Sequence, residues 1–264
     1  MSDKAVLTTE DLTIGYSGSR SRDPIVVASG LNLELRDGMV TALLGANGVG
    51  KSTLLRTLSR QQEPLAGGVR IFERDMRKLS AGEVARAISV VHTERTNAGA
   101  LTVREVVGIG RQPYTGFFGR LNSDDRLIVD EALEAVGISA IAGRYMANIS
   151  DGQRQKTMIA RALAQQTPVM ILDEPTSFLD VAARLETVGL LSSLARDFNK
   201  AILLSMHDIA DALTVADRLW LFRPDRTIVD GPKDELVDSG LMDSLFPDSP
   251  IQFDHKILDY RLTR

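Results

Sequence analysis

Apolar residues fall mainly in short strand-like segments in the first part of the chain, with strict alternation at residues 31–35, while in the last part helical patterns alternate with short apolar runs. Early strand patterns fall at residues 5–8, 12–16, 25–27, 31–35, 69–72 and 88–91, with a buried apolar run at 39–44 and helical patterns at 51–59 and 83–87. Later, helical patterns at 153–164, 181–198 and 209–216 alternate with buried strands at 169–172, 201–205 and 219–222. This alternation predicts an α/β fold with a mostly parallel sheet, preceded by an antiparallel β-subdomain.

The middle of the chain departs from this alternation. Helical patterns at 103–108 and 124–136 are separated by loops rich in glycine and proline. We expect an inserted helical subdomain at about residues 95–150, within one domain that spans residues 1–240. Residues 241–264 form a C-terminal tail, for which the short apolar segments at 251–253 and 257–258 predict an irregular path with one or two strands.

Composition narrows the class of protein. The 264 residues are 44% apolar, which allows a sizeable core, and the net charge of -4 with dispersed Lys and Arg argues against a nucleic-acid partner. Cysteine is absent, so disulfides and thiolate metal sites are excluded. The N-terminus has no apolar signal region, and no run approaches the roughly 18 apolar residues of a membrane span. We expect a chain that meets a membrane only through a partner.

A glycine-rich segment follows the buried run at 39–44 and opens the helix at 51–59. It reads GANGVGKST and fits G-x-x-x-x-G-K-[ST], a loop whose backbone N–H groups and following helix N-terminus bind phosphate. Lys51 would reach the β- and γ-phosphates, and the Ser52 hydroxyl would bind Mg²⁺. The candidate nucleotide-binding residues of this segment are Gly45, Asn47, Gly48, Gly50, Lys51, Ser52 and Thr53.

Two carboxylates end the buried strand at 169–172. Asp173 is placed to orient the Mg²⁺ shell, as acids at this position do in phosphate-loop enzymes. Glu174 would then lie beside the γ-phosphate, where it could polarise an attacking water as general base. Without the upstream glycine-rich loop, the same pair could be a solvated strand end.

Together with further segments, these motifs resemble the ABC ATPase family over roughly residues 5–240. Tyr16 resembles the aromatic that stacks on adenine, and Ser177-Phe178-Leu179-Asp180 resembles the loop that couples two ATP sites. His207 resembles the histidine beside the γ-phosphate. The resemblance implies an ATPase with Lys51, Glu174 and His207 as catalytic residues, ATP as substrate and Mg²⁺ as cofactor.

Residues 149–153, Ile-Ser-Asp-Gly-Gln, resemble the family's signature motif. Ser150, Gly152 and Gln153 would contact the γ-phosphate held by an opposite subunit, which implies a second ATPase chain. We expect a homodimer, with a mixed pair left open. Asp151 stands where the family usually has glycine, and it brings negative charge towards a polyphosphate.

A second departure concerns the residue that supplies a further Mg²⁺ ligand. The family usually has glutamine after the strand at 88–91, whereas this chain reads Val-His-Thr-Glu-Arg at 91–95. Glu94 could bind Mg²⁺ through a charged oxygen, while Thr93 is too short without a bridging water. The sequence leaves the choice between them open.

The segments at 111–121, 124–126 and 136–138 resemble the bacterial importer ATPases for ferric siderophores, haem and cobalamin. This implies transmembrane permease subunits as partners, a substrate-binding protein as an indirect partner, and a peripheral place at the cytoplasmic face of the inner membrane. Residues 95–121 would receive the permease. An iron complex is the expected cargo, with a cobalamin importer or a non-transport ABC ATPase as alternatives.

Overall fold

The computed structural model describes residues 4–18, 23–92, 98–247 and 249–262. The strands are β1 Ala5–Tyr16, β2 Ile25–Leu31, β3 Glu34–Arg36, β4 Val40–Leu44, β5 Ala66–Ile71, β6 Arg74–Asp75, β7 Ile88–Val91, β8 Val169–Asp173, β9 Ala201–Ser205, β10 Arg218–Phe222, β11 Ile228–Pro232, β12 Ile251–Asp254 and β13 Asp259–Leu262. The α-helices are α1 Lys51–Leu58, α2 Ala81–Ala87, α3 Val103–Ile109, α4 Ser123–Ala135, α5 Asp151–Ala164, α6 Val181–Asp197, α7 Ile209–Val215 and α8 Lys233–Asp238.

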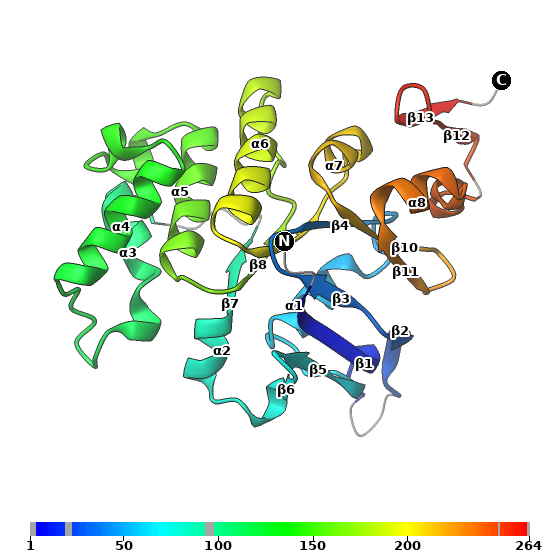
Figure 1. Ribbon diagram of the computed structural model, residues 1–264, viewed down its shortest axis with the longest axis horizontal. Coiled ribbons are helices and arrows are strands. Elements are labelled where there is room, and N and C mark those ends of the chain that lie inside the picture. The colour runs from blue at the N-terminus through cyan, green and yellow to red at the C-terminus, as the bar shows by residue number, and fades with distance from the viewer. Residues whose placement is uncertain (1–3, 19–22, 93–97, 248, 263–264) are drawn as a thin grey trace.

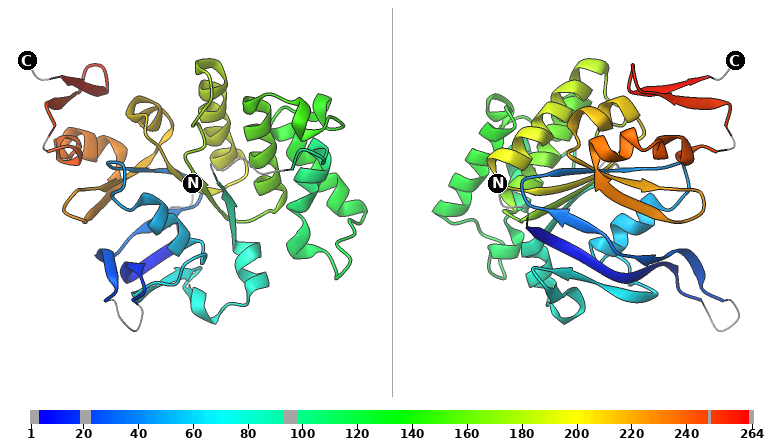
Figure 2. Two further views of the ribbon diagram at one scale, coloured as in Figure 1. Left: turned by 180° about the vertical axis from the view of Figure 1, so that it is seen from behind. Right: turned by 45° about the vertical axis from the view of Figure 1, so that its right-hand side comes forward.

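The largest sheet among the described residues has the order β11-β10-β4-β9-β8-β7. All neighbours pair in parallel except β11, which runs antiparallel to β10. Helices α5, α6 and α7 cover one face, while α1 lies against the other (Figures 1 and 2). The strands β4, β8 and β9 therefore bring the residues that follow them to one edge of the sheet, as the sequence predicts.

A second sheet, antiparallel, has the order β2-β1-β5-β6, with β3 also paired to β1. The sequence predicts two strands at 5–8 and 12–16, but the structure has one long strand, β1. Its register with β2 and β5 shifts around residues 10–15, and Asp11 adopts a positive φ of 44°. These irregularities break the apolar alternation without ending the strand, which is why the pattern reads as two pieces.

Alternation along β4 divides the core into two clusters. Val40, Ala42 and Leu44 join the cluster built with the covering helices, whereas Leu43 joins Leu54 of α1 in the cluster that faces the antiparallel sheet. All five β4 residues are buried. Helix α1 is thereby fixed against the sheet directly after the glycine-rich loop, so the loop is anchored at both ends.

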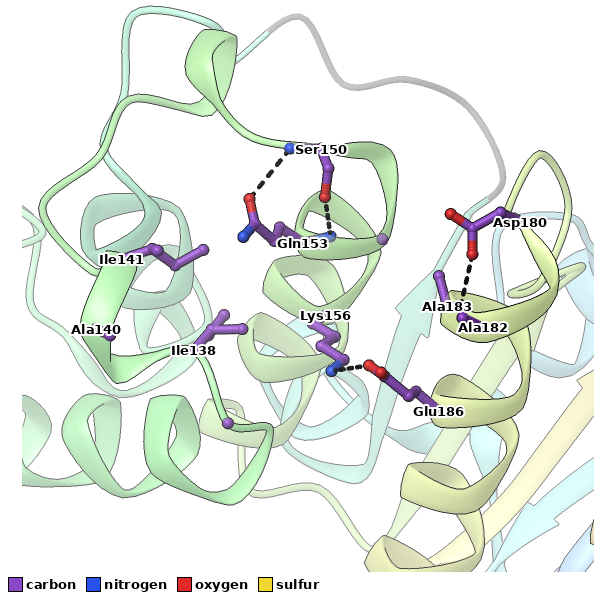
Figure 3. A pocket seen from close by; sticks show the side chains of 12 residues that line it. Ile138, Ala140, Ile141, Ser150, Gln153, Lys156, Asp180, Ala182, Ala183 and Glu186 are labelled. Carbon is purple, nitrogen blue, oxygen red and sulfur yellow. Dashed lines mark hydrogen bonds and ion pairs between the residues drawn. The ribbon is translucent and has the colours of Figure 1, made fainter.

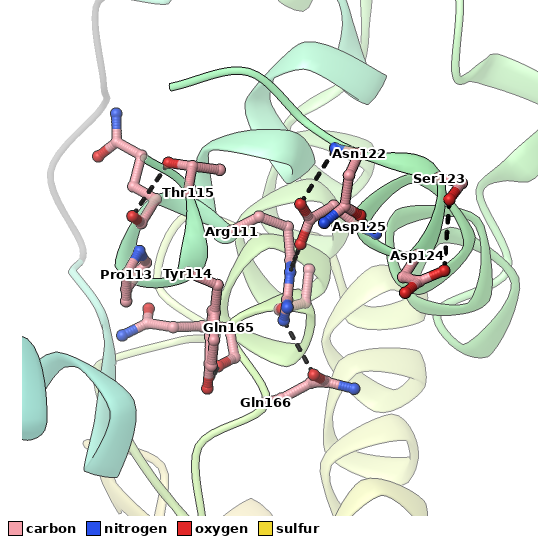
Figure 4. A network of polar contacts seen from close by, with 12 residues as sticks. Arg111, Pro113, Tyr114, Thr115, Asn122, Ser123, Asp124, Asp125, Gln165 and Gln166 are labelled. Carbon is pink, nitrogen blue, oxygen red and sulfur yellow. Dashed lines mark hydrogen bonds and ion pairs between the residues drawn. The ribbon is translucent and has the colours of Figure 1, made fainter. Parts of the chain in front are cut away.

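Helices α3 and α4 pack on α5 beside the main sheet. Both begin with capping boxes, Thr102 with Glu105 and Asn122 with Asp125, which satisfy the free N–H groups of the first turn. The link between them is tied to the start of α4 through Arg111, which is buried and donates to Asp125 Oδ1 at 2.9 Å (Figure 4).

The same guanidinium also reaches the end of α5. Arg111 donates to the Ala164 carbonyl oxygen at 2.8 Å and to Gln166 Oε1 at 2.9 Å, and its carbon Cζ lies 4.0 Å from the ring centre of Tyr114. Arg86 of α2 donates to the Pro113 carbonyl oxygen at 2.8 Å. The segment after α3 is therefore held to both α2 and α5.

The C-terminal part is more regular than the sequence pattern indicates. The prediction has an irregular tail with one or two strands, and the structure has a 3₁₀ helix at Leu241–Leu245 and a hairpin of β12 and β13. Tyr260 packs edge-on against Phe246 and Phe253, and it hydrogen-bonds to the Met242 carbonyl oxygen. In the part of the chain that the structure describes, no helix has the length and apolarity to cross a membrane.

Candidate functional site

The glycine-rich loop curls at the carboxyl end of β4 and leads into α1. Gly50, the residue before α1, has a φ of 125°, and a Cβ there would lie 2.3 Å from Val27 Cγ1. A Cβ on Gly45 would lie 2.5 Å from the Phe222 carbonyl oxygen. Only glycine fits these two positions, because the loop is wedged between β2 and β10.

Lys51 is buried, and its Nζ donates to the Gly45 carbonyl oxygen at 2.7 Å and to the Ala46 carbonyl oxygen at 3.2 Å. Burial lowers the pKa of Lys51 from its ordinary value, while the negative charges of Glu174 and Asp173 oppose that shift. The ammonium group thus lies across the loop and donates to carbonyl oxygens. It can exchange these acceptors for the oxygens of a phosphate group, because a charged phosphate is the stronger acceptor.

One pocket of about 380 Å³ gathers most of the predicted nucleotide residues. Its lining consists of Tyr16, Asn47, Gly48, Gly50, Lys51, Ser52, Thr53, Glu174 and His207. Tyr16 is half exposed, and its hydroxyl lies 3.1 Å from Thr53 Oγ1. Its ring therefore stands at the side of the pocket, tied to the first turn of α1.

Glu174 follows β8 in a left-handed conformation with a φ of 49°. Its carboxylate is contacted on both oxygens: Ser177 Oγ donates to Oε2 at 3.0 Å, and His207 Nε2 contacts Oε1. His207 itself comes from the turn after β9, two residues beyond the strand. The structure thus brings together two residues that are 33 positions apart in the chain.

Asp173 ends β8 next to the base candidate. Its Oδ1 accepts a hydrogen bond of 2.6 Å from Ser205 Oγ, and the N–H of Glu174 donates to the same hydroxyl at 2.9 Å. The sequence predictions do not include Ser205, nor the contact of Ser177 with Glu174. The only signal for Ser205 is a hydroxyl at the end of an otherwise apolar strand.

The oxygen donors at this edge suit Mg²⁺. Mg²⁺ takes hard oxygen ligands and is commonly held by one or two protein groups together with substrate phosphates. The Ser52 hydroxyl on the first turn of α1 and the Asp173 carboxylate are such donors. Among the described residues, no group of three or more His, Cys, Asp or Glu is placed to hold a metal ion by itself. Thr93 and Glu94, the two candidates for a further ligand, lie outside the described residues.

The signature residues line a different pocket, of about 450 Å³, between the start of α5 and the start of α6 (Figure 3). Ser150 caps α5: its Oγ accepts from the Gln153 N–H at 3.2 Å, and Gln153 Oε1 accepts from the Ser150 N–H at 3.2 Å. Gly152 packs so closely on α6 that an added Cβ would lie 3.0 Å from Ala183 Cβ.

Asp180 and Lys156 complete the walls of this pocket. Asp180 caps α6 through the Ala183 N–H at 2.8 Å, and Lys156 pairs with Glu186 at 2.7 Å, which joins α5 to α6. Asp151 sits in the first turn of α5, 3.8 Å from Arg154 Nε. Within one chain, those predicted site residues that the structure describes therefore form two separate groups, one around the phosphate loop and one around the signature.

Comparison with known proteins identifies the family. The family model described as ABC transporter matches residues 28–177. The chain is 40% identical over 241 residues to an uncharacterized ABC transporter ATP-binding protein of Methanocaldococcus jannaschii, an alignment that covers 91% of this chain and 81% of that protein. It is 37% identical over 242 residues to the ferric enterobactin transport ATP-binding protein of Escherichia coli, covering 92% of this chain and 87% of that protein.

Among solved structures, cbiO1 of Clostridium perfringens, part of the ABC transporter complex cbiONQ, superposes with a TM-score of 0.75. The two chains are 27% identical, and the match covers 91% of this chain and 96% of that one. The likeness therefore extends beyond the phosphate loop to the whole arrangement of sheets and helices. On these matches in sequence and structure, the chain belongs to the ABC transporter family, as an ATP-binding subunit.

Proposed function

We propose that this chain is the Mg²⁺-dependent, ATP-hydrolysing subunit of an importer for a metal chelate, with an iron complex as cargo. The observation that carries the proposal is the single pocket in which the phosphate loop, Glu174 and His207 meet. A nucleotide triphosphate bound along the loop would present its terminal phosphate to these two side chains. The domain that performs this work spans residues 1–240, with an insertion at about 95–150 and a tail at 241–264.

The nucleotide is bound by the phosphate loop and Tyr16. The exposed face of the Tyr16 ring offers a surface on which the adenine base stacks, while its hydroxyl is retained by Thr53. Backbone N–H groups of residues 45–53 and the N-terminal end of α1 hold the phosphates, and Lys51 shifts from carbonyl oxygens to the phosphate oxygens. Bound Mg²⁺, held by Ser52 and Asp173 with the phosphates, would neutralise charge that develops during the transfer.

Hydrolysis depends on the positions of Glu174 and His207. The Glu174 carboxylate would accept the proton of the attacking water, and His207, which contacts this carboxylate, would also reach the γ-phosphate. Ser177 holds the second carboxylate oxygen, so the base keeps one orientation. Most of the rate acceleration then comes from positioning and charge stabilisation rather than from covalent chemistry.

Two chains are needed because the signature residues line a separate pocket. Ser150, Gly152 and the N-terminal end of α5 form a second anion-binding surface, which would complete the site of an opposing chain. Two identical chains that face each other would bind two ATP molecules in two equivalent composite sites. Hydrolysis removes the shared γ-phosphates and lets the pair reopen.

A permease would dock on residues 95–121, of which 98–121 are described. Phe117 and Phe118 are 99% and 83% exposed at the tip of this segment, with their rings in an edge-on pair 5.5 Å apart. The buried Arg111 network fixes the base of the same segment to α2 and α5. Movement of the helical insertion would therefore be transmitted to the permease, which holds this chain at the cytoplasmic face of the plasma membrane and meets a substrate-binding protein on its other side.

The test of cargo is uptake by cells that lack this gene, complemented with the native chain or with Lys51→Ala. Ferric siderophore, haem and cobalamin are offered separately with a radioactive metal. The proposal predicts that uptake of an iron complex returns only with the native chain. Cobalamin uptake that returns instead would replace the cargo, and no dependence of any of the three on this gene would overturn the importer assignment.

A further inference from the structure

Ser205 occupies a place in the sheet that nothing in the motif series explains. It is the last residue of β9, it is fully buried, and it lies opposite Asp173 in the parallel ladder between β8 and β9. The strands β8 and β9 are neighbours in the main sheet, and both have a strand on either side. The other described residues of β9 are alanine, isoleucine and leucine, so this strand end is polar only at Ser205.

Its hydroxyl makes two hydrogen bonds whose directions are fixed by their partners. The Glu174 N–H can only donate, and it lies 2.9 Å from Ser205 Oγ. The single proton of the hydroxyl then goes to Asp173 Oδ1, 2.6 Å away. One side chain thus joins the carboxylate proposed for Mg²⁺ to the backbone of the residue proposed as general base.

The bond to the Glu174 N–H supports an unfavourable backbone conformation. Glu174 has a φ of 49°, in the left-handed region that a side chain with a Cβ rarely occupies. This turn directs the Glu174 side chain into the pocket, where it meets Ser177 and His207. Without the Ser205 hydroxyl, the Glu174 N–H would lose its hydrogen-bond acceptor, and the strained turn would lose the bond that stabilises it.

The bond to Asp173 Oδ1 holds that carboxylate in one orientation about its Cβ–Cγ bond. An acid that binds a metal gains affinity when an outer hydrogen-bond donor orients it in advance, and loss of such a partner typically lowers metal affinity or activity about 10- to 100-fold. Ser52, the second Mg²⁺ donor, belongs to α1, which is anchored independently by its packing on the sheet. Ser205 therefore acts on one of the two donors and leaves the other in place.

We infer that Ser205 is a positioning residue, which orients Asp173 for Mg²⁺ and holds the turn that aims Glu174. The inference rests on the proposed ATPase function and adds a residue to it. A serine that only filled space at the strand end would contribute equally to nucleotide binding with and without Mg²⁺. A positioning residue contributes mainly when Mg²⁺ is present.

The experiment measures the affinity of the purified full chain for a fluorescent ATP analogue, once in excess EDTA and once in Mg²⁺. The ratio of the two dissociation constants is the Mg²⁺ enhancement. For Ser205→Ala we expect the EDTA affinity within about twofold of the native chain and the Mg²⁺ enhancement lowered about tenfold. Ser205→Thr keeps a hydroxyl and should restore the enhancement.

An unchanged Mg²⁺ enhancement in Ser205→Ala, or equal losses of affinity in EDTA and in Mg²⁺, would overturn the inference. Thermal unfolding without nucleotide checks that each variant is folded. Should the alanine variant not fold, Ser205→Cys takes its place, because sulfur keeps the volume but is a weak donor and acceptor; native-like enhancement in it would equally overturn the inference.

Failure of the proposed function gives a different result. Lys51→Ala serves as the reference for a damaged phosphate loop, which should lose affinity in EDTA as well as in Mg²⁺. If the native chain binds the analogue no better than Lys51→Ala under both conditions, the nucleotide site itself is wrong. If the native chain binds the analogue better than Lys51→Ala, the nucleotide site is supported. If Ser205→Ala then shows the same Mg²⁺ enhancement as the native chain, the positioning role of Ser205 is wrong.

Discussion

The Ser177 hydroxyl donates a hydrogen bond of 3.0 Å to Oε2 of Glu174, three residues earlier in the chain. The bond crosses the turn that leaves β8, and it complements the contact of His207 Nε2 with the other carboxylate oxygen. The base candidate therefore has both oxygens engaged by groups of its own chain. Its orientation is set by the fold before any second chain arrives.

Glu174→Gln should lower the rate of ATP hydrolysis about 10²- to 10⁴-fold, which is the usual contribution of a positioned general base. Glutamine keeps the shape and can still accept from Ser177, so ATP binding should persist. Single-turnover hydrolysis and ATP affinity, measured on the same preparation, check both points. Ser177→Ala is the matched control and should lose much less rate, because the carboxylate remains. Near-normal hydrolysis by Glu174→Gln would remove Glu174 from the role of base.

The ion pair of Arg111 with Asp125 offers a test of how the insertion is held. Both side chains are about 5% exposed or less, and loss of one partner of a buried pair typically costs about 3–5 kcal/mol. Arg111→Ala should lower the free energy of unfolding by about this amount in urea. Arg104→Ala breaks an ion pair with Asp130 that is half exposed, and should cost about 0–1 kcal/mol. Equal effects of the two variants would contradict the anchoring role of Arg111.

The same pair gives a pH dependence. Burial opposes the charge on Asp125, but the hydrogen bonds from Arg111 and from the Asn122 N–H outweigh it and lower the pKa of Asp125 below its ordinary value. Because the folded pKa lies below the unfolded one, this stability is present at neutral pH and is lost as the pH falls through the folded value. Urea unfolding gives the free energy of unfolding of the native chain and of Asp125→Asn at pH 7 and at pH 3. The difference in this free energy between the two proteins should be smaller at pH 3 than at pH 7. A constant difference would contradict it.

The negative charge of Asp151, within the signature motif, should weaken ATP-dependent dimerisation. Its carboxylate lies in the first turn of α5, beside the surface proposed for the γ-phosphate of an opposite chain. Asp151→Gly should tighten ATP-dependent dimerisation a few-fold, in line with the roughly 0.2–1 kcal/mol typical of exposed charge interactions. Asp151→Asn removes the same charge without adding backbone freedom and should have the same effect. Unchanged dimer affinity in a sedimentation titration would show that this charge does not act on the composite site.

Much of the sheet, and much of the lining of the pocket beside the glycine-rich loop, could be predicted from the sequence. The buried strands β4, β8 and β9 are short apolar runs followed by Gly45, Glu174 and, two residues after the strand, His207, so parallel pairing brings their ends to one edge. Asn47, Gly48, Lys51, Ser52 and Thr53 lie where the loop pattern predicts, in one pocket with Tyr16. Local pattern suffices here because each strand is almost uniformly apolar.

Other features depend on contacts between distant segments and leave no local pattern. The polarity of Ser205 gains meaning only when β9 pairs with β8 and Asp173 lies opposite it. Strand β11 and helix α8 were not predicted, since both are short and only partly buried. The signature and the phosphate loop line separate pockets in the fold of one chain, an arrangement in keeping with the expectation that the signature acts on an opposite subunit.

That separation makes ATP-driven association the most direct test of the composite site. Sedimentation velocity with Mg²⁺ and ATP compares Glu174→Gln with the double variant that adds Ser150→Arg, and a fluorescent analogue measures ATP binding by each monomer. We predict that Glu174→Gln forms dimers, and that the double variant stays monomeric while its monomers bind ATP with native-like affinity. Dimers of the double variant with undiminished affinity, or loss of ATP binding by its monomers, would contradict a site shared between two chains.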